Sequence, residues 1–447
     1  MKAIARILVF AIELCLFSVF CNATNNFEYV DRTYTINLKS SPDSFRDIVK
    51  NYTIGSEIMK RIHNITWTIG RIFGEELLSR VWGNYQVKPE FRAFVSEMDA
   101  IKRGLNSFVT NETRPVTTFQ IFLINLLYEF DAQCTAVMAV QQPEDVVRLA
   151  HNLDFTNQDF FRKIYVATGF VNDTVIFNCS GPAGNIGGMM CTRIGNYSIA
   201  INERALHDKD RMEKNLKEGR WPTMWLIRKV LTTCSTYEEA VKELRTQTTV
   251  SGSYLSIAGA RVGVNATGYY DGIILTKSPD SVDHEEHLTS TRRFLLQCNT
   301  DWDKTNDTTD PTIRTKKGLY ALEDIHGSEL KEKFTSQQLR DYVLKNYPNL
   351  RTDNDTQPKD QEGTVSIVSM EPSGPDPIKS WIYWPPKENT CLNGKECNNT
   401  EGDDHGFCCC DVNGRNCKCC LNRAYRCYNI DGNECVYSPA SHMLRGF

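Results

Sequence analysis

The chain has 447 residues, a formal net charge of -4 and a hydrophobic fraction of 41%. This length is enough for one large domain, or two ordinary ones, with a full hydrophobic core. The slightly acidic balance provides no basic surface for nucleic acid, so we expect no nucleic-acid partner.

The first 23 residues have the organisation of a secretory signal peptide. A basic start precedes an apolar run from Ile7 to Phe20, and Cys21-Asn22-Ala23 offers small residues to signal peptidase. An uncleaved anchor is the alternative, but the run is short for a membrane span and Glu13 interrupts it. We therefore expect cleavage after Ala23, no later membrane span, and a secreted or lumenal mature protein.

Glycosylation sequons agree with the secretory route. Asn-x-Ser/Thr occurs ten times after the expected signal, which suggests surface glycans, although Asn178 lies next to Cys179 and is a poorer acceptor. The ten acceptors are Asn51, Asn64, Asn111, Asn172, Asn178, Asn196, Asn265, Asn306, Asn354 and Asn398.

Residues 24–133 are expected to be helical, because Ile54, Ile58, Ile62 and Ile69 fall near one helical face. After Gln133 the pattern changes to short strands, interrupted by helices at 223–232 and 237–245 and by a third at 336–344. The strands are expected at 134–140, 163–168, 174–177, 197–201, 254–258, 273–275, 293–297, 364–370 and 380–384. Strands clustered with paired helices predict sheets packed between helical layers.

The cysteines divide into groups. Of seventeen, Cys15 and Cys21 leave with the signal and ten lie between Cys391 and Cys435. Four more, Cys179, Cys191, Cys234 and Cys298, are expected to pair with one another, which leaves Cys134 as the odd thiol.

Residues 391–447 are expected to form a separate module, after a linker at 385–390. The segment has few aliphatic residues and cannot build a core of its own, so cross-links must stabilise it. Adjacent cysteines such as Cys408-Cys409-Cys410 also occur in zinc sites, but His405 is the only nearby histidine. We favour five disulfides over a metal and expect no metal or cofactor in the protein.

Cys134 opens the first of the expected strands, directly after an apolar helical run that ends in Gln133. A chain break before Cys134 would give this residue both a nucleophilic thiol and an α-amino group that serves as base. A cysteine before a strand is more often a buried hydrophobic residue, so the pattern alone does not establish a nucleophile.

The motifs around Cys134 resemble the acid ceramidase and N-acylethanolamine acid amidase family. Seven motifs follow the family order over approximately residues 34–384: Asn125-x-x-Tyr128-Glu129 before Cys134-Thr135, then Asn152-Leu-Asp154-Phe, Ile201-Asn-Glu-Arg204, Trp225-Leu-Ile-Arg228, Tyr237-Glu-Glu-Ala240, Cys298-Asn299-Thr-Asp-Trp302 and Asp310-Pro-Thr-Ile-Arg314. The resemblance implies an α+β N-terminal nucleophile (Ntn) hydrolase fold, a four-layer αββα sandwich. It also implies cleavage between Gln133 and Cys134, and hydrolysis of a fatty-acyl amide at acidic pH in a secreted or lysosomal setting. On this basis 24–133 would be the upstream chain and 134–390 the catalytic chain.

The resemblance also assigns roles to site residues. Cys134 would be nucleophile and base, Asp154 would hold its new ammonium group, and Asn299 would donate to the oxyanion. Arg314 corresponds to an arginine that lines the pocket. As isolated residues, Asp154 would be a cap in a turn at a strand end, Asn299 a turn residue and Arg314 a surface charge. Glu203 is a supporting candidate, or else a surface ion pair with Arg204.

The chain departs from the family where an arginine usually precedes Asn-x-Asp, because His151 occupies that position. Histidine is charged only below about pH 6.5, so we expect a protonated His151 to favour the thiolate at lysosomal pH. The result would be a steeper dependence on acid, or weaker catalysis.

Two functions remain open from the sequence. The first is an amidase whose partners are a lipid amide substrate and its own two cleaved chains, with transient membrane or lipid-activator contact. Trp221, Met224 and Trp225 are candidates to line the acyl groove, unless they anchor a core helix. The second is a catalytically weakened secreted binding protein that acts through residues 391–447.

Overall fold

The computed structural model describes residues 27–111, 113–129, 133–141, 144–155, 157–204, 208–301 and 363–383. It also describes short strands near the C-terminus: β15 (Cys408–Cys409), β16 (Lys418–Cys419), β17 (Arg426–Tyr428) and β18 (Glu434–Val436). These last strands form two antiparallel pairs, β15 with β16 and β17 with β18. The expected signal peptide, linker, helix at 336–344 and disulfides of the tail lie outside the described residues.

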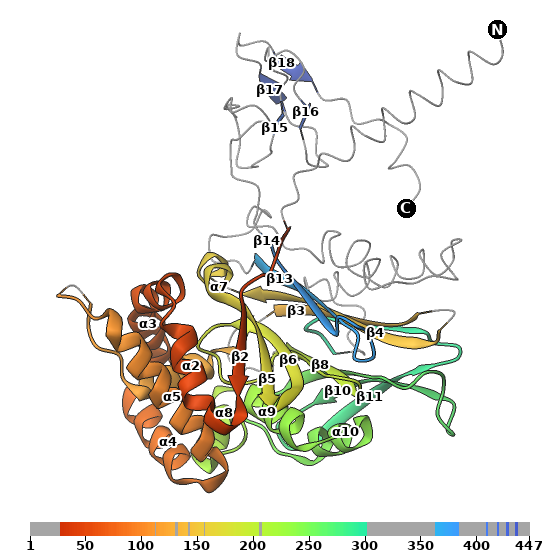
Figure 1. Cartoon of the computed structure of the whole chain (residues 1–447), viewed down its shortest axis with the longest axis horizontal. Helices are drawn as coiled ribbons and strands as arrows, with labels where there is room; N and C mark the ends of the chain where they lie inside the picture. Colours follow the sequence, from red (N-terminus) through yellow and green to blue (C-terminus); the bar gives the residue numbers. More distant parts are fainter. Residues whose placement is uncertain are drawn as a thin grey trace. The chain divides into compact units, whose positions relative to one another are not determined.

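Two sheets form the centre of the main unit (Figure 1). The eight-stranded sheet has the order β11 (Val282–Thr289), β10 (Tyr269–Lys277), β9 (Ser253–Gly259), β8 (Tyr197–Glu203), β7 (Met190–Arg193), β6 (Thr174–Pro182), β5 (Tyr165–Asn172), β2 (Thr33–Asn37). The six-stranded sheet has the order β1 (Phe27–Tyr29), β14 (Ile378–Tyr383), β13 (Gly363–Met370), β4 (Val146–Phe155), β3 (Gln133–Gln141), β12 (Phe294–Gln297). Strands β3 and β4 contact β8 and β9, so the two sheets stack face to face.

Helices cover these sheets. α9 (Thr223–Thr233) contacts β6 and β7, and α10 (Tyr237–Thr246) contacts β9 and β10, while α7 (Gln158–Ile164) contacts β4 and β13 of the other sheet. The upstream helices gather at one side of the main unit (Figure 1): α2 (Ser41–Val49), α3 (Tyr52–Phe73), α4 (Glu75–Val87), α5 (Arg92–Leu105) and α6 (Thr118–Asn125). α8 (Lys209–Glu218) contacts α4. The main unit therefore has the α+β architecture of sheets and helical layers that the sequence predicts.

Local sequence signals explain the helix boundaries. The Asn51 side chain accepts from the backbone N–H of Ile54 at the start of α3. The four isoleucines predicted for one face of this helix are buried: Ile54, Ile58, Ile62 and Ile69. Thr117 with Gln120, and Thr236 with Glu239, form capping boxes at the starts of α6 and α10.

Several sequence predictions need correction. The segment 24–133 is not purely helical, because β1 joins the six-stranded sheet and β2 joins the eight-stranded sheet in parallel with β5. Strands β4, β7 and β11 were not predicted, and the strand expected at 163–168 begins only at Tyr165, after α7. In β4 almost every residue is buried, so the alternation that marks a half-exposed strand is lost.

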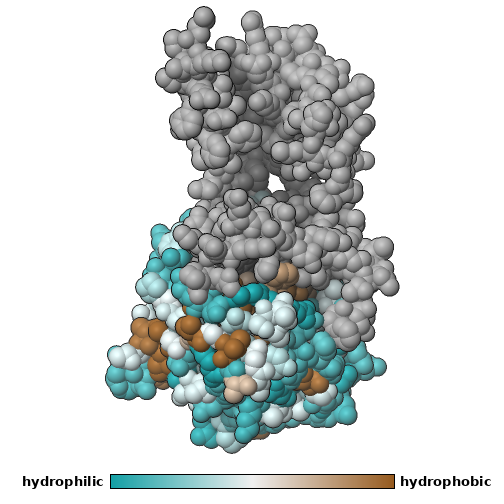
Figure 2. All heavy atoms as spheres, turned by 90° about the vertical axis from the view of Figure 1, so that its right-hand side faces the viewer, coloured by the Kyte–Doolittle hydropathy of each residue, from teal (hydrophilic) through white to brown (hydrophobic). Residues whose placement is uncertain are grey.

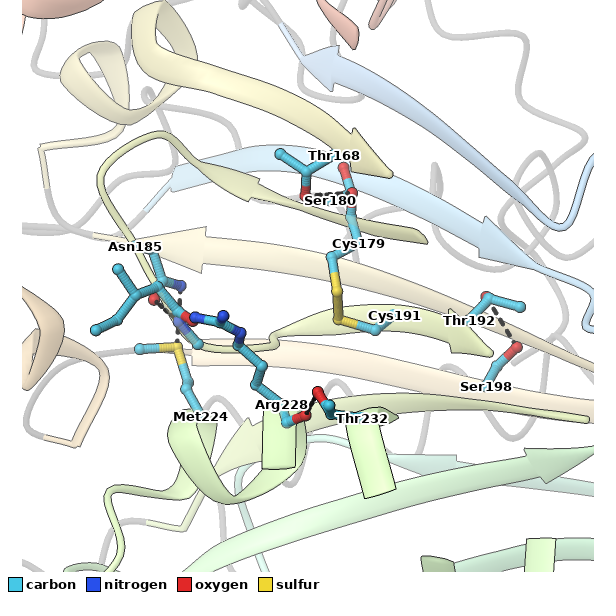
Figure 3. Close-up of a disulfide and its surroundings, with 12 residues drawn as sticks. Thr168, Cys179, Ser180, Asn185, Cys191, Thr192, Ser198, Met224, Arg228 and Thr232 are labelled. Carbon is cyan, nitrogen blue, oxygen red and sulfur yellow. Dashed lines mark hydrogen bonds between the residues drawn. A yellow bond between two sulfur atoms is a disulfide. The ribbon is translucent and has the colours of Figure 1, made fainter. Parts of the chain in front are cut away.

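The predicted pairing of four cysteines is half wrong. Cys179 and Cys191 form a disulfide between the paired strands β6 and β7 (Figure 3). Cys234 and Cys298 do not pair with each other. Cys234 follows α9 outside the eight-stranded sheet, whereas Cys298 follows β12 in the other sheet and lies 3.6 Å from the Thr135 hydroxyl.

The surface of the described residues is mixed. On the face in Figure 2, hydrophobic patches are small and separated by hydrophilic residues. None of the described helices combines the length and the apolar composition that a bilayer crossing needs.

Candidate active site

Cys134 lies at the start of β3 and is fully buried between the sheets. Its backbone N–H donates to Asn299 Oδ1 at 2.8 Å, and its Sγ lies 3.4 Å from the Tyr128 hydroxyl oxygen. The nitrogen held by Asn299 belongs to the peptide bond between Gln133 and Cys134. The structure therefore brings Asn299 to the predicted cleavage bond, at the nitrogen side.

Asn299 owes this position to the pairing of β12 with β3. Gln297 is opposite Ala136, so the antiparallel register carries Asn299 to the level of Cys134. Asn299 Nδ2 donates to the backbone carbonyl of Glu203 at 2.7 Å. The side-chain amide is thus fixed from both ends, with its oxygen on the nitrogen of Cys134 and its nitrogen on β8.

Asp154 lies within β4, opposite Gln133, rather than in the turn that its sequence context suggested. It is fully buried, and Asp154 Oδ1 accepts from the Thr364 hydroxyl at 2.7 Å. The carbonyl of Thr364 accepts from Nη2 of Arg162 at 2.7 Å and from its Nε at 3.3 Å. Arg162 is itself fully buried, so a cation and a carboxylate are both bound to Thr364 in this interior.

His151 lies opposite Ala136 and is fully buried on the face that carries Cys134. His151 Nε2 lies 3.0 Å from the Ile201 carbonyl oxygen, which can only accept, so Nε2 carries the hydrogen. Burial lowers the pKa of His151 to about 4. This shift is opposite to the expectation of a protonated His151, because burial favours the neutral imidazole at pH values above about 4.

The buried neutral His151 predicts a loss of stability in acid. Between the unfolded pKa of about 6.5 and the folded value of about 4, only the unfolded chain takes up the proton. Above pH ~6.5 the neutral His151 makes its full contribution to the free energy of unfolding. By pH ~4 this contribution has fallen by about 3 kcal/mol. We expect His151→Gln to lose correspondingly less stability than wild type across this window, measured by urea unfolding at several pH values. The difference at neutral pH is the internal reference, and parallel losses in both proteins would contradict the prediction.

Glu203 and Arg204 do not form the surface ion pair considered from the sequence. Arg204 Nε donates to Asp301 at 2.7 Å, and Arg204 Nη1 donates to Asp283 at 2.5 Å. Glu203 is buried on β8 and presents its backbone carbonyl to Asn299.

The three residues proposed to line the acyl groove have different surroundings. Trp225 is fully buried and stacks on Phe94 at 4.8 Å between ring centroids, and Trp221 packs edge-on against Phe91 at 4.7 Å. Both therefore anchor the helical core. Met224, in contrast, lines an apolar pocket between α3, α6 and α7.

The sequence motifs did not indicate the roles of Tyr128, Arg162 and Thr364 in this geometry. Tyr128 could have been found from the sequence, because it belongs to one of the family motifs. Arg162 and Thr364 belong to none of these motifs. Arg314 lies outside the described residues. Among the described side chains no group of three histidine, cysteine or acidic residues could hold a metal ion.

Comparisons with known proteins find amidases and ceramidases of similar sequence. No family model matches the chain. The N-acylethanolamine-hydrolyzing acid amidase of Caenorhabditis elegans is 25% identical over 317 residues, which are 67% of this chain and 82% of that enzyme. The rat enzyme of the same name is 29% identical over 160 residues, 35% of this chain and 41% of the relative. The match to the rat enzyme thus spans less than half of its length.

Acid ceramidases match as well, at 24% identity. A solved structure of the Caenorhabditis elegans N-acylethanolamine-hydrolyzing acid amidase ortholog aligns with a TM-score of 0.45 at 24% identity, over 56% of this chain and 99% of that chain. By these sequence matches, the chain is similar to N-acylethanolamine-hydrolyzing acid amidases and acid ceramidases.

Proposed function

We propose that this chain is an N-terminal nucleophile cysteine amidase, which cuts itself between Gln133 and Cys134 and then hydrolyses a fatty-acyl amide. One observation carries the proposal. The nitrogen of the bond to be cut is held by Asn299, at the start of a buried strand whose first thiol faces the interior between the sheets.

Self-cleavage would begin with attack of Cys134 Sγ on the carbonyl carbon of Gln133. As the S–C bond forms, the C–N bond breaks and the nitrogen of Cys134 takes up the proton that the thiol gave. Water then cleaves the thioester, which leaves a carboxylate on Gln133 and a thiol with an α-amino group on Cys134. The hydrogen bond from this nitrogen to Asn299 supports the proposal, since it orients the leaving group before the reaction.

Amide hydrolysis would repeat the same steps on a bound substrate. The α-amino group of Cys134 would accept the thiol proton and deliver it to the leaving amine, and water would release the fatty acid from the thioester. Asp154 pairs with Gln133, the residue before Cys134, and would hold the new ammonium group. After cleavage, the side-chain amide of Asn299 would donate a hydrogen bond to the oxyanion. Arg314 would line the pocket.

The two chains made by the cut, 24–133 and a catalytic chain of 134–390 followed by the 391–447 module, would remain associated. Glu129 of the upstream segment accepts from the backbone N–H of Thr223 at 2.6 Å and from the Ser251 hydroxyl. Arg228 of α9 forms a buried ion pair with Glu97 of α5. Both contacts join residues on opposite sides of the Gln133–Cys134 bond.

An apolar pocket next to Cys134 supports a substrate with a long acyl chain. The walls of this pocket are mainly isoleucine, leucine, phenylalanine and methionine, the apolar surface that an acyl chain would contact. Tyr128 lines this pocket, and its hydroxyl touches Cys134 Sγ. An acyl chain in the pocket would thus end beside the nucleophile. The expected signal peptide and the similarity to enzymes named acid amidase and acid ceramidase favour a secreted or lysosomal setting.

The pocket predicts selectivity for chain length. Ile65 on α3 lines the pocket, whereas Ile72 on the same helix is 49% exposed and does not. We expect Ile65→Trp to lower kcat/KM for a palmitoyl amide by about tenfold, the scale of a filled apolar subsite, with little change for a butyryl amide. Ile72→Trp is the matched control and should change neither value. Equal losses on both substrates would contradict an acyl role for this pocket.

Release of fatty acid tests the proposed activity directly. Purified protein is incubated at acidic pH with N-palmitoylethanolamine or with ceramide, and the palmitate is quantified. We expect release from at least one of the two. No release from either, by protein with an intact fold, would contradict the proposal and leave the tail-driven binding protein as the alternative.

A further inference from the structure

Tyr128 belongs to the segment before the cut, yet it reaches the nucleophile. It lies in the 3-10 turn Leu127–Glu129 and is 2% exposed. Its hydroxyl oxygen is 3.4 Å from Cys134 Sγ and 2.6 Å from the Ile201 carbonyl oxygen. The next residue, Glu129, is bound to Thr223 and Ser251. These contacts hold Tyr128 in place independently of the Gln133–Cys134 bond.

The hydrogen atoms around Tyr128 can be assigned from the acceptors. The Ile201 carbonyl only accepts, so Tyr128 donates to it at 2.6 Å and turns an oxygen lone pair toward Cys134 Sγ. His151 Nε2 donates to the same carbonyl at 3.0 Å. The carbonyl therefore keeps one donor if the hydroxyl hydrogen of Tyr128 turns away from it.

We propose that Tyr128 is a positioning residue that turns its hydroxyl hydrogen from the Ile201 carbonyl to Cys134 Sγ as the thiol loses its proton. The inference rests on the proposed function, because it concerns the same nucleophile. A hydrogen bond to the charged form of a group favours that form, so the turned hydroxyl stabilises the thiolate. His151, neutral and fixed, makes the rotation possible by satisfying the carbonyl.

The other groups around the thiol favour the same assignment. Burial, reinforced by the neighbouring Cys134, raises the pKa of Tyr128 well above its ordinary value, so the phenol remains a donor. Glu203 on β8 and Glu129 beside Tyr128 also raise the pKa of Tyr128, and burial favours the neutral form of His151. Tyr165 on β5 is buried, and its hydroxyl accepts from Ser180. Tyr128 is the tyrosine whose hydroxyl lies 3.4 Å from the sulfur, and this distance is the basis of its assignment.

The two reactions should depend on Tyr128 to different degrees. Before the cut, the nitrogen of Cys134 is an uncharged amide, so no ammonium group at residue 134 supports the thiolate. After the cut, the new α-amino group lies beside the sulfur and shares this task. Removing the Tyr128 hydroxyl should therefore slow self-cleavage more than it slows amide hydrolysis, a difference that a merely structural residue would not produce.

The pH profile of self-cleavage tests the inference. In Tyr128→Phe we expect the rate in acid to fall about tenfold and the profile to move up by about one pH unit, the scale of one lost hydrogen bond to a charged group. Tyr197→Phe is the control, since Tyr197 is equally buried but donates to the carbonyls of Val230 and Cys234. It should cleave like wild type. A Tyr128→Phe protein with the wild-type rate and profile would overturn the inference.

A second variant decides the case if Tyr128→Phe does not fold. Replacement of Tyr128 by 3-fluorotyrosine keeps the hydroxyl and makes it a stronger donor, so the profile should move to lower pH. An unmoved profile would again overturn the inference. Absence of cleavage in the wild-type protein contradicts the proposed function instead, whereas a cleaving wild type with unaffected Tyr128 variants contradicts only the role of Tyr128.

Discussion

Cys134→Ala should abolish both self-cleavage and amide hydrolysis, with residual rates lower than wild type by about a thousandfold or more. Both reactions require the same sulfur as nucleophile. The fold should persist, because alanine suits a strand that already contains Ala136 and Ala139, and losing one buried sulfur costs about 1 kcal/mol. A reducing gel measures the cut, fatty-acid release measures hydrolysis, and far-UV circular dichroism checks the fold.

Two variants make this result specific. Cys234→Ala removes another buried thiol, outside the eight-stranded sheet, and should leave both reactions near the wild-type rates. Cys134→Ser should fold and react slower by orders of magnitude, because a serine hydroxyl has no accessible anion in acid. Hydrolysis that survives in Cys134→Ala would mean that a different group carries the chemistry.

Arg228→Met should destabilise the protein by about 3–5 kcal/mol, the usual cost of leaving one charge of a buried ion pair alone. Arg228 Nη2 donates to Glu97 Oε1 at 2.6 Å, Nη1 donates to the other carboxylate oxygen, and Nη1 also donates to the Ile186 carbonyl at 2.7 Å. Its guanidinium lies 5.2 Å from the ring centroid of Phe45 and 5.2 Å from that of Phe94. Figure 3 shows Arg228 extending from α9 toward the loop that carries Asn185.

A half-exposed ion pair between α9 and α10 provides the matched control. Lys229 pairs with Glu243, with side chains 29% and 27% exposed, so Lys229→Met should cost only about 0–1 kcal/mol. Urea unfolding compares the two, and the double variant Glu97→Leu/Arg228→Met should recover much of the loss, since no charge remains buried. Equal destabilisation by Arg228→Met and Lys229→Met would contradict the assigned role of the pair.

The sequence allowed β3 to be predicted because small and β-branched residues follow an apolar helical run directly. It did not allow β4 to be predicted, because nearly every residue of β4 is buried and polar His151, Asn152 and Asp154 interrupt the apolar pattern. The consequence was an error of chemistry. A protonated His151 was expected to favour the thiolate, but a strand position between the sheets removes His151 from water and favours its neutral form.

The contact between Tyr128 and Cys134 shows a second limit of sequence reasoning. The two residues are close in the chain, but their geometry depends on the Ile201 carbonyl and on the attachment of Glu129 to Thr223. Both partners belong to later elements of the fold. Likewise, counting cysteines could not separate the Cys179–Cys191 disulfide from Cys234 and Cys298, since parity carries no information on which face of a sheet a thiol lies.

The new N-terminus after acid treatment tests the central claim most directly. Mass spectrometry of the purified protein, reduced after incubation at lysosomal pH, reads the ends of the chains. We expect a peptide that begins at Cys134, a matching peptide that ends at Gln133, and neither product from Cys134→Ala. A chain that stays intact across Gln133–Cys134 under these conditions, or a cut at another bond, would contradict the proposal that Cys134 is an N-terminal nucleophile.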